Sequence, residues 1–443
     1  MTISNSSFSI RHAFRAGGVT PHWFIIQTLT KTHGTLEKAQ SRVLILLLIS
    51  VWINYIDRGN LSIAAPALMP ELGIEPARMG LLLAGFFFTY STCQVIAGWV
   101  VDRFDVARVY GYGFLLWSAA TVATGFANSF WSLFALRLVL GAGESIAYPA
   151  YSKILTEYFP EHRRGFLNAL VDAGTKAGPA IGTLLGGLII ARFGWRAFFI
   201  GFGLVTMLWL WPWFQAAPKR GTGGFMGKTA AGGPTMRDIL RRPEAIAACG
   251  GLFCFNYAYY FLLTWLPSYL VNERHFSMER MSVMASIPFW GIAIVSVIFG
   301  WLSDRLIISG YSTTKVRKRI AVGGLLGGML LLPAAIAQDA GVSMALLIAA
   351  CLACGMYTSN AWAISQTLAG PAAGKWTGLQ NGFGNLGGVA APILTGWIVQ
   401  KTGIFHLAFV AATVSLGVAA FVYAFVIRKV EPIDWPKSGQ TQA

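Results

Sequence analysis

Six ionisable residues lie inside long apolar stretches of the sequence, where charged side chains are rare. They are Asp57, Arg58, Arg137, Glu144, Asp172 and Lys176. A charge inside an apolar segment of membrane length is costly, so each of these residues is by default a candidate for function. All six lie in the first half of the chain. We therefore expect proton or anion chemistry there, and neutral polar and aromatic contacts from the second half.

Two acids and one arginine of this set suggest proton chemistry. Arg137 and Glu144 are seven residues apart, which places them two turns apart on one helix face. Burial disfavours the charged form of a carboxyl group, and a nearby guanidinium favours it again. A movement of Arg137 relative to Glu144 or Asp57 would then load and release a proton. The alternative is an ion-pair network that only joins helices, although desolvation makes such buried pairs weak stabilisers.

Arg58 is the best candidate for binding an anion, because a guanidinium is permanently charged and can hold a carboxylate through two hydrogen bonds. Asp57 is adjacent, but successive helical residues point about 100° apart and do not face each other. Arg137 and Lys176, by contrast, have acids on their own helices. Arg58 is therefore predicted to be the least neutralised cation. Tyr55, three residues earlier, shares its face, with core packing as the alternative role.

Lys176 allows two interpretations. Asp172 lies four residues earlier, so the two side chains can pair along the helix and neutralise each other. Otherwise Lys176 is a second cation facing the cavity, and a dicarboxylate or a larger acid becomes a plausible substrate. Thr175 beside it is a further candidate for substrate contact.

The second half offers neutral groups that can donate hydrogen bonds to hydroxyls or stack on a ligand. The candidates are Tyr257, Tyr260, Ser359, Trp362, Asn381 and Asn385. Asn381 and Asn385 are four residues apart and share one helix face, where amides can bind substrate hydroxyl groups. Contacts between helices are the alternative, above all for Asn385.

The elements that must position these residues are apolar segments long enough to cross a bilayer, about 20 residues each. Hydrophobic residues make up 55% of the 443 residues and charged residues 12%, whereas soluble proteins carry about 25% charge. This composition excludes a disordered or coiled-coil chain and argues against a soluble enzyme. We expect an all-α membrane protein with twelve transmembrane helices. Their approximate ranges are 43–66, 79–101, 109–127, 131–154, 166–191, 196–216, 244–271, 281–303, 319–338, 343–368, 377–400 and 404–427.

A hydrophilic stretch at 217–243 separates two six-helix bundles, 42–216 and 244–428, and two tails flank them, 1–41 and 429–443. The first tail is polar and basic and lacks a signal-peptide pattern, so it is a cytoplasmic tail or the product of a start codon placed too early. Two motifs recur in both halves: Gly98-Trp-Val-Val-Asp102-Arg103 with Gly300-Trp-Leu-Ser-Asp304-Arg305, and Gly187…Gly194 with Gly396…Gly403. Paired halves of this kind are typical of transporters.

The basic residues predict the orientation. With the N-terminus inside, the cytoplasmic segments hold 25 Lys and Arg and the other side holds 6. This bias places both termini in the cytoplasm, and it explains the net charge of +16 without a nucleic-acid partner. The five cysteines form no disulfide framework, and a buried pair is the better interpretation of Cys351 and Cys354. No metal-ligand cluster or nucleophile–base pair stands out, so we expect neither an enzyme nor a bound cofactor.

The loop after the second span resembles the signature of the major facilitator superfamily, with Gly98, Asp102, Arg103 and Arg108 at the matching positions. Asp304 and Arg305 repeat part of it after the eighth span. The resemblance covers about 42–430 and implies the major facilitator fold of two pseudo-symmetric bundles. In that family the loop carboxylate is thought to clamp neighbouring helix ends in the outward-facing state.

Three further segments resemble the anion:cation symporter family, which includes galactonate, glucarate and hexuronate transporters. They are Asn54-Tyr55-Ile56-Asp57-Arg58-Gly59-Asn60-Leu61, Arg137-Leu-Val-Leu-Gly-Ala-Gly-Glu144-Ser-Ile-Ala-Tyr-Pro149 and Tyr259-Tyr260-Phe-Leu-Leu-Thr264-Trp265-Leu-Pro267. The resemblance implies protonation at Asp57 and Glu144, coupling through Arg137, and binding of the substrate carboxylate by Arg58 with Tyr90 beside it. It also places Ser359, Trp362 and Asn381 along the sugar-acid site.

These patterns together predict a proton-coupled symporter that imports an organic anion, a sugar acid, across a bacterial inner membrane by alternating access. The expected partners are the substrate, protons and lipid, with the protein as a monomer. The alternatives are import of an aromatic or dicarboxylic acid, a sensor that binds without transport, and a proton-driven exporter of organic anions or drugs. The exporter is suggested by Gly174-x-x-x-Gly178-Pro179, which resembles an antiporter motif.

Overall fold

The computed structural model describes residues 38–159, 161–217 and 234–435. Within these residues the chain is helical and has no strand. Most of the expected first tail and of the expected central loop lies outside the described residues. The all-α fold predicted from composition is confirmed.

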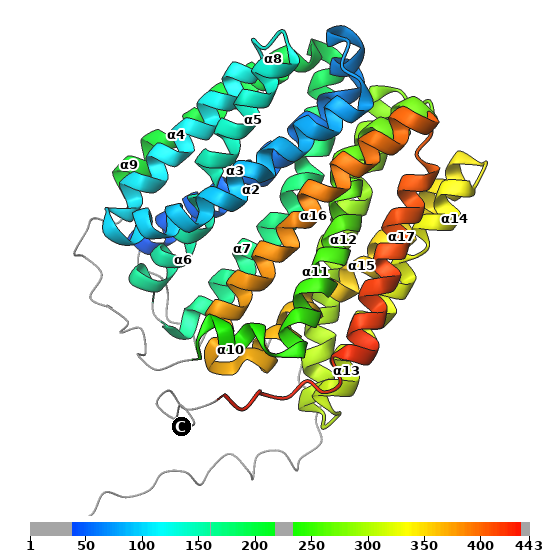
Figure 1. The fold of residues 1–443 in the computed structure, drawn as a ribbon. Coiled ribbons are helices and arrows are strands. Elements are labelled where there is room, and N and C mark those ends of the chain that lie inside the picture. Colours follow the sequence, from blue (N-terminus) through cyan, green and yellow to red (C-terminus); the bar gives the residue numbers. More distant parts are fainter. Residues whose placement is uncertain (1–37, 160, 218–233, 436–443) are drawn as a thin grey trace, which may run out of the picture.

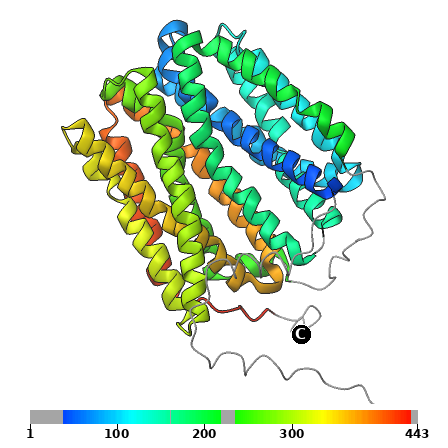
Figure 2. The ribbon, with the colours of Figure 1, turned by 180° about the vertical axis from the view of Figure 1, so that it is seen from behind.

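The helices form two bundles that lie side by side, α2–α9 on one side and α11–α17 on the other (Figure 1, and from behind in Figure 2). The first bundle contains α2 (Lys38–Leu72), α3 (Pro76–Arg103), α4 (Val106–Thr124), α5 (Phe130–Glu144), α6 (Ala147–Tyr158), α7 (Glu161–Ile181), the π-helical turn η1 (Gly182–Gly186), α8 (Gly187–Met207) and α9 (Leu210–Ala216). The short α10 (Met236–Leu240) precedes the second bundle, which contains α11 (Pro243–Ser268), η2 (Tyr269–Glu273), α12 (Met278–Ile308), α13 (Thr313–Gly328), α14 (Leu331–Ile336), α15 (Ala340–Ala369), η3 (Gly370–Ala372), α16 (Ala373–Thr402), α17 (His406–Phe421) and η4 (Val422–Val426).

Nine of the described helices are long and apolar enough to cross a bilayer, or ten if the bent pair Pro76–Gln94 and Ile96–Arg103 forms one span. One of the nine, Leu170–Ala216, corresponds to two of the expected spans. The chain reverses direction within it at Gly194, where φ is 80°. The 19-residue helix α4 occupies the place of the expected third span. The arrangement is therefore consistent with the twelve spans predicted.

Local sequence signals explain where several helices begin and end. The Asp105 side chain accepts a hydrogen bond from the Arg108 amide and caps α4, and Ser129 forms a capping box with Ser132 at the start of α5. Gly403 ends α16 with a φ of 77°, a left-handed conformation that glycine adopts without strain.

The bundle has two ends. We call the end with the turns at 73–75, 125–129 and 403–405 the Gly73 end, and the end with the turns at 104–105 and 309–312 the Asp102 end. Between the halves, α3 packs along α16, α2 along α11, and α7, η1 and α8 along α12.

Hydrogen bonds between the halves occur at mid-height and at the Gly73 end. Gln400 of α16 donates to the Glu75 carboxylate at 2.9 Å and accepts from the Ala77 amide at 3.0 Å. The Ser62 hydroxyl of α2 donates to the carbonyl of Leu263 in α11 at 2.8 Å. These contacts join the two halves on the side of the bundle nearer the Gly73 end.

The glycine repeat detected in the sequence closes this end symmetrically. A Cβ atom added at Gly396 would lie 2.4 Å from the carbonyl oxygen of Pro76 in the other half. One added at Gly187 would lie 2.0 Å from the Ser282 hydroxyl, again across the halves. Seven residues after each of these glycines, the chain turns at Gly194 and Gly403. The internal repeat therefore supplies the residues that let the halves approach closely.

The loop signature at the Asp102 end makes contacts within its own half. Lys153 of α6 lies 3.6 Å from the largely exposed Asp102 carboxylate and donates to the carbonyls of Val101 and Asp102. The Arg103 guanidinium lies over the ring of Trp99. This network joins the end of α3 to α6.

The repeated signature in the second half behaves in the same way. Asp304 of α12 pairs with Arg317 of α13 at 3.5 Å, and Arg305 lies over the ring of Trp301. Gly98 has open space around it, whereas Gly300 packs against Ser359.

The chain after η4 packs along the Asp102 end of the second bundle as far as the structure describes it. The Val430 amide donates to the Thr314 hydroxyl at 3.0 Å, and the Ile433 amide donates to the Leu368 carbonyl at 3.0 Å. The Trp435 indole donates to the Ala369 carbonyl at 2.9 Å. The first part of the expected 429–443 tail is thus bonded to α13 and to the last two residues of α15.

Candidate functional site

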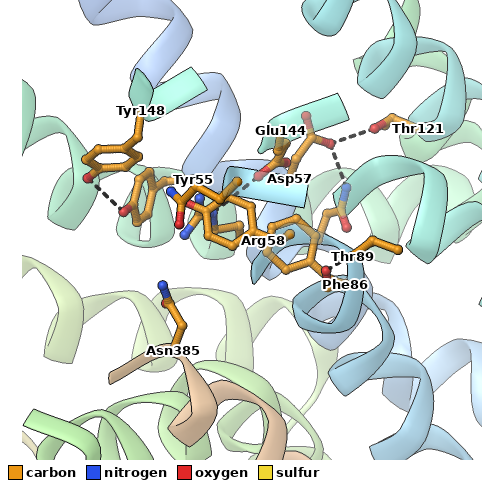
Figure 3. Close-up of polar contacts among 12 residues, drawn as sticks. Tyr55, Asp57, Arg58, Phe86, Thr89, Thr121, Glu144, Tyr148 and Asn385 are labelled. Carbon is orange, nitrogen blue, oxygen red and sulfur yellow. Dashed lines mark hydrogen bonds and ion pairs between the residues drawn. The ribbon is translucent and has the colours of Figure 1, made fainter. Parts of the chain in front are cut away.

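Arg58 is buried on α2 of the first bundle, and Figure 3 shows it beside Tyr55 and Glu144. Its Cζ atom is 4.5 Å from the ring centroid of Tyr55 and 4.4 Å from that of Tyr90. Its Nε atom donates to the Glu144 carboxylate at 3.2 Å, and the two side chains are 3% and 0% exposed. The expected association of Arg58 with Tyr55 and Tyr90 is present, in a fully desolvated setting.

The prediction that Arg58 is the least neutralised cation is wrong, since Glu144 pairs with it instead of with Arg137. The physical reason is distance along the helix: a spacing of seven residues aligns two side chains but separates them by about 10 Å. Salt bridges on one helix form at spacings of three or four. Arg58 approaches Glu144 from the neighbouring α2. The Arg137 guanidinium instead lies 5.5 Å from the ring centroid of Phe86.

Asp57 is held by neutral donors and not by Arg58. Its Oδ1 atom accepts hydrogen bonds from Thr121 of α4 at 2.8 Å and from the Asn60 amide at 2.9 Å (Figure 3). Arg137 is close enough to interact with it electrostatically. The two acids therefore have separate environments, one against an arginine and the other against a hydroxyl and an amide.

Several buried polar atoms around these charges have no hydrogen-bond partner within the described part of the chain. They are Nδ2 and Oδ1 of Asn54, Oδ2 of Asp57, Nη2 of Arg58, Nε of Arg137 and Oε1 of Glu144. Buried polar groups are normally paired, so such a cluster marks atoms that water, a proton or a ligand group would satisfy. Arg58 and Glu144 each keep one unused atom beside the bond that joins them.

Tyr148 is a part of the site that the residue-by-residue sequence analysis did not single out. Its hydroxyl is 3.1 Å from the hydroxyl of Tyr55, which stacks on Arg58 (Figure 3). The signal was available, since Tyr148 falls inside the segment Arg137–Pro149 used for the family resemblance. Thr121, by contrast, lies on α4 in a segment without any motif, and tertiary packing brings it to Asp57.

The second bundle contributes Tyr260 and Asn385 to the same region. The Tyr260 hydroxyl donates to the Asn385 side-chain oxygen at 3.2 Å, and the Tyr260 ring packs edge-on against Phe87 of α3 at 4.7 Å. Tyr260 also interacts electrostatically with Arg58. Figure 3 shows Asn385 approaching from the half opposite Arg58. Two of the predicted second-half residues thus face the predicted anion ligand.

The other second-half candidates are less closely connected to Arg58. Ser359 packs against Gly300, with a buried hydroxyl that has no partner among the described residues. The Tyr257 hydroxyl is likewise buried and unpaired there. Trp362 and Asn381 are half-buried.

Lys176 forms an ion pair with Asp172, as one of its two interpretations predicted. The Lys176 Nζ atom lies 2.6 Å from the Asp172 carboxylate. The Thr175 hydroxyl donates to the Asp172 carbonyl, so it is engaged within its own helix. Among the residues that the structure describes, no group of three or more His, Cys, Asp or Glu is placed to hold a metal ion. The site is therefore one of fixed charges, hydroxyls and aromatic rings.

The chain was compared with known families and proteins. A family model described as Major Facilitator Superfamily matches residues 47–373 and 281–443. A probable sulfoacetate transporter of Cupriavidus necator is 29% identical over 425 residues, covering 91% of this chain and 98% of its own. The D-galactonate transporter of Escherichia coli O6:H1 is 29% identical over 404 residues, covering 86% and 94%. The hexuronate transporter of Bacillus subtilis is 29% identical over 418 residues, covering 91% and 97%.

Among solved structures, a bacterial homologue of the human lysosomal transporter Spinster, in an inward-facing and unoccupied conformation, superposes with a TM-score of 0.77. It is 19% identical and covers 89% of this chain and 98% of its own. At that identity the likeness concerns the fold. The family expected from the loop signature and the three motif segments is confirmed by the family model and the curated relatives.

Proposed function

Since the chain belongs to the Major Facilitator Superfamily and its curated relatives transport sugar acids and other anions, we propose that it is a proton-coupled symporter that imports a sugar acid. The proposed location is a bacterial inner membrane with both termini in the cytoplasm, as the bias of 25 against 6 basic residues predicts. In this orientation the Asp102 end faces the cytoplasm.

The observation that carries the proposal is the Arg58–Glu144 pair. An anion entering mid-membrane needs a compensating positive charge, because desolvating a lone charge is prohibitive. Arg58 supplies that charge in a preformed setting, with its guanidinium against the rings of Tyr55 and Tyr90 and with Nη2 unpaired among the described residues. Its planar fork matches the two oxygens of a carboxylate.

The same pair gives a physical basis for coupling. A proton that binds Glu144 removes the negative charge facing Arg58, and the guanidinium is then free to bind a substrate carboxylate. By linkage, a bound carboxylate favours protonation of Glu144 to the same extent. Substrate and proton are therefore taken up together. Asp57, held by Thr121 and Asn60 with one oxygen unused, is the second proposed proton site.

Selectivity for a sugar acid is assigned to the opposite half. Tyr260 and Asn385 present a hydroxyl and an amide toward Arg58, and both groups can donate to and accept from sugar hydroxyls. A substrate bound between Arg58 and this pair would contact both halves, which is how a ligand couples to their relative movement. The contacts between halves at the Gly73 end support a conformation that is closed there.

The test is transport by the purified full-length protein in proteoliposomes. D-galactonate, a hexuronate and sulfoacetate are offered with and without an inwardly directed proton gradient. We expect D-galactonate or the hexuronate to accumulate only with the gradient, and proton entry to accompany the uptake. Accumulation of sulfoacetate alone would show that the substrate is not a sugar acid. Efflux driven by the same gradient would indicate an exporter, and binding without counterflow would indicate a sensor; either result would overturn the proposal.

A further inference from the structure

The Thr121 hydroxyl of α4 binds a partner outside its own helix. A threonine inside a helix commonly donates its hydroxyl proton to a carbonyl one turn earlier on the same helix. Thr124 of α4 does so, and donates to the Ala120 carbonyl at 2.8 Å. Thr121 instead donates to the Asp57 carboxylate of α2 at 2.8 Å. Since a hydroxyl has one proton to donate, Thr121 gives it to the acid and not to its own helix.

The two oxygens of the Asp57 carboxyl group have different surroundings. Oδ1 accepts hydrogen bonds from Thr121 at 2.8 Å and from the Asn60 amide at 2.9 Å. Oδ2 is buried and has no hydrogen-bond partner among the described residues. A proton that binds Asp57 can therefore attach at Oδ2 while Oδ1 keeps both of its donors. The two donors fix the orientation of the carboxyl group in both protonation states.

The charged groups near Asp57 are Arg137 and Glu144, which lie on α5, and Arg58, its neighbour on α2. Arg58 is engaged by Glu144, and Arg137 interacts electrostatically with both acids. All four side chains are buried. The contact that Asp57 receives from α4 is a neutral hydroxyl, so Thr121 acts on it by hydrogen bonding and not by charge.

Burial and hydrogen bonding act on Asp57 in opposite directions. Its side chain is 0% exposed, and a fully buried carboxylate is stable only where donors or opposite charges replace the water that it has lost. Hydrogen bonds donated to a carboxylate favour its ionised form, and a bond to a charged group contributes more than a bond between neutral groups. Thr121 therefore favours release of a proton from Asp57, whereas burial favours its retention.

We propose that Thr121 is a positioning residue for proton coupling: its hydroxyl holds Asp57 so that Oδ2 receives the proton, and it allows that proton to leave again. This inference rests on the proposed function, in which Asp57 is the second proton site. Without the Thr121 hydroxyl, Asp57 keeps its proton at a higher pH, and the transport cycle slows at the step where the proton is released.

The test is Thr121→Val in the purified full-length protein, because valine keeps the shape of the side chain and removes the hydroxyl. The infrared band of the protonated Asp57 carboxyl group is the band that Asp57→Asn abolishes, and its intensity is titrated with pH. Losing a donor to a charged group changes proton binding about tenfold or more, so this titration should move by about one pH unit toward alkaline pH. Thr121→Ser restores a hydroxyl and should titrate like the wild type. Thr124→Val is the matched control, since the Thr124 hydroxyl bonds only within α4, and it should leave the titration unchanged.

Uptake in proteoliposomes is the functional measurement, made at a constant pH difference while the pH on both sides is raised together. Uptake by Thr121→Val should fall about fivefold or more at neutral pH and recover about one pH unit higher. Exchange of labelled for unlabelled substrate needs no net release of protons and should keep its wild-type rate. A merely structural role of Thr121 would lower uptake and exchange together, without moving the pH profile.

The outcomes separate this inference from the function on which it rests. If the wild-type protein shows no uptake driven by a proton gradient, the proposed function fails. If the wild-type protein is coupled but Thr121→Val titrates unchanged, or Thr124→Val shifts equally, the inference is refuted and the proposed function stands. Thermal unfolding shows whether each variant is folded. Should Thr121→Val fail to fold, Asn60→Leu removes the other donor to Oδ1 and must shift the titration in the same direction.

Discussion

Glu144→Gln tests the coupling scheme most directly, because it keeps the shape of the side chain and removes its charge. In the wild-type protein the Glu144 carboxylate lies 3.2 Å from Nε of Arg58, with both side chains almost completely buried. At that distance the attraction is about 5 kcal/mol at an effective dielectric constant of 20. Removing one partner of a buried pair costs about 3–5 kcal/mol, because the other charge is left uncompensated.

The substrate-free protein is destabilised by the uncompensated charge of Arg58, and a bound substrate carboxylate restores part of that lost stability. We therefore expect Glu144→Gln to lower the unfolding temperature without ligand and to bind the substrate at least about tenfold more tightly, a gain of about 1.4 kcal/mol. Binding should also lose most of its pH dependence between pH 5 and 8. Uphill accumulation driven by a proton gradient should disappear, while exchange of labelled for unlabelled substrate across the membrane should persist.

The measurements are calorimetry at several pH values, gradient-driven uptake and counterflow in proteoliposomes. Glu157→Gln is the matched control, since Glu157 is a half-exposed acid of α6 that lies 3.7 Å from Lys153. Gradient-driven accumulation at the wild-type level in Glu144→Gln, or substrate binding that keeps its full pH dependence, would refute the scheme. Coupling would then have to be sought at Asp57.

Three further changes test other parts of the structure. Arg58→Lys keeps the charge but loses the planar fork between Tyr55 and Tyr90, so calorimetry should show at least about tenfold weaker anion binding, and wild-type affinity would remove Arg58 from the site. Gly396→Ala places a Cβ 2.4 Å from a backbone oxygen of the other half, so the two halves should separate at the Gly73 end. Transport should fall, and a cysteine introduced at that end should react faster with a thiol probe. Gly417→Ala is the control, since its added Cβ makes only ordinary contacts and should leave both measurements at the wild-type level. Trp435→Ala removes the hydrogen bond from the indole to the Ala369 carbonyl, so the free energy of unfolding should fall by about 1 kcal/mol. Thermal unfolding measures the change. An unchanged unfolding temperature would show that the chain after η4 adds no stability.

The fold and several contacts of the site were predictable because they depend on composition, periodicity and spacing along one helix. The Asp172–Lys176 pair follows from a spacing of four, and the approach of Tyr55 to Arg58 follows from a spacing of three. The matching turns at Gly194 and Gly403 were visible as an internal repeat. These features need no knowledge of which helices are neighbours.

The partner of Glu144 was not predictable in the same way. Spacing along α5 suggested Arg137, but the actual partner comes from α2, and only the packing of the two helices decides between them. The same holds for Thr121 at Asp57, which arrives from α4. Sequence patterns identified the charged residues of the site, and tertiary contacts decided how they pair.

The sum of the buried charges bears on how many protons accompany the substrate. Asp57, Arg58, Arg137 and Glu144 are all buried, so the substrate-free site is neutral when these two acids and two arginines are ionised. Net charge in a low-dielectric region is expensive, which favours loading steps that keep the sum at zero. One proton and a monoanion satisfy this condition through Arg58 and Glu144. A dianion would require a second proton, and Asp57, with one carboxylate oxygen unpaired in the described structure, is placed to take it. On this reasoning the number of protons carried follows the charge of the acid carried, and the two buried acids set its upper limit at two.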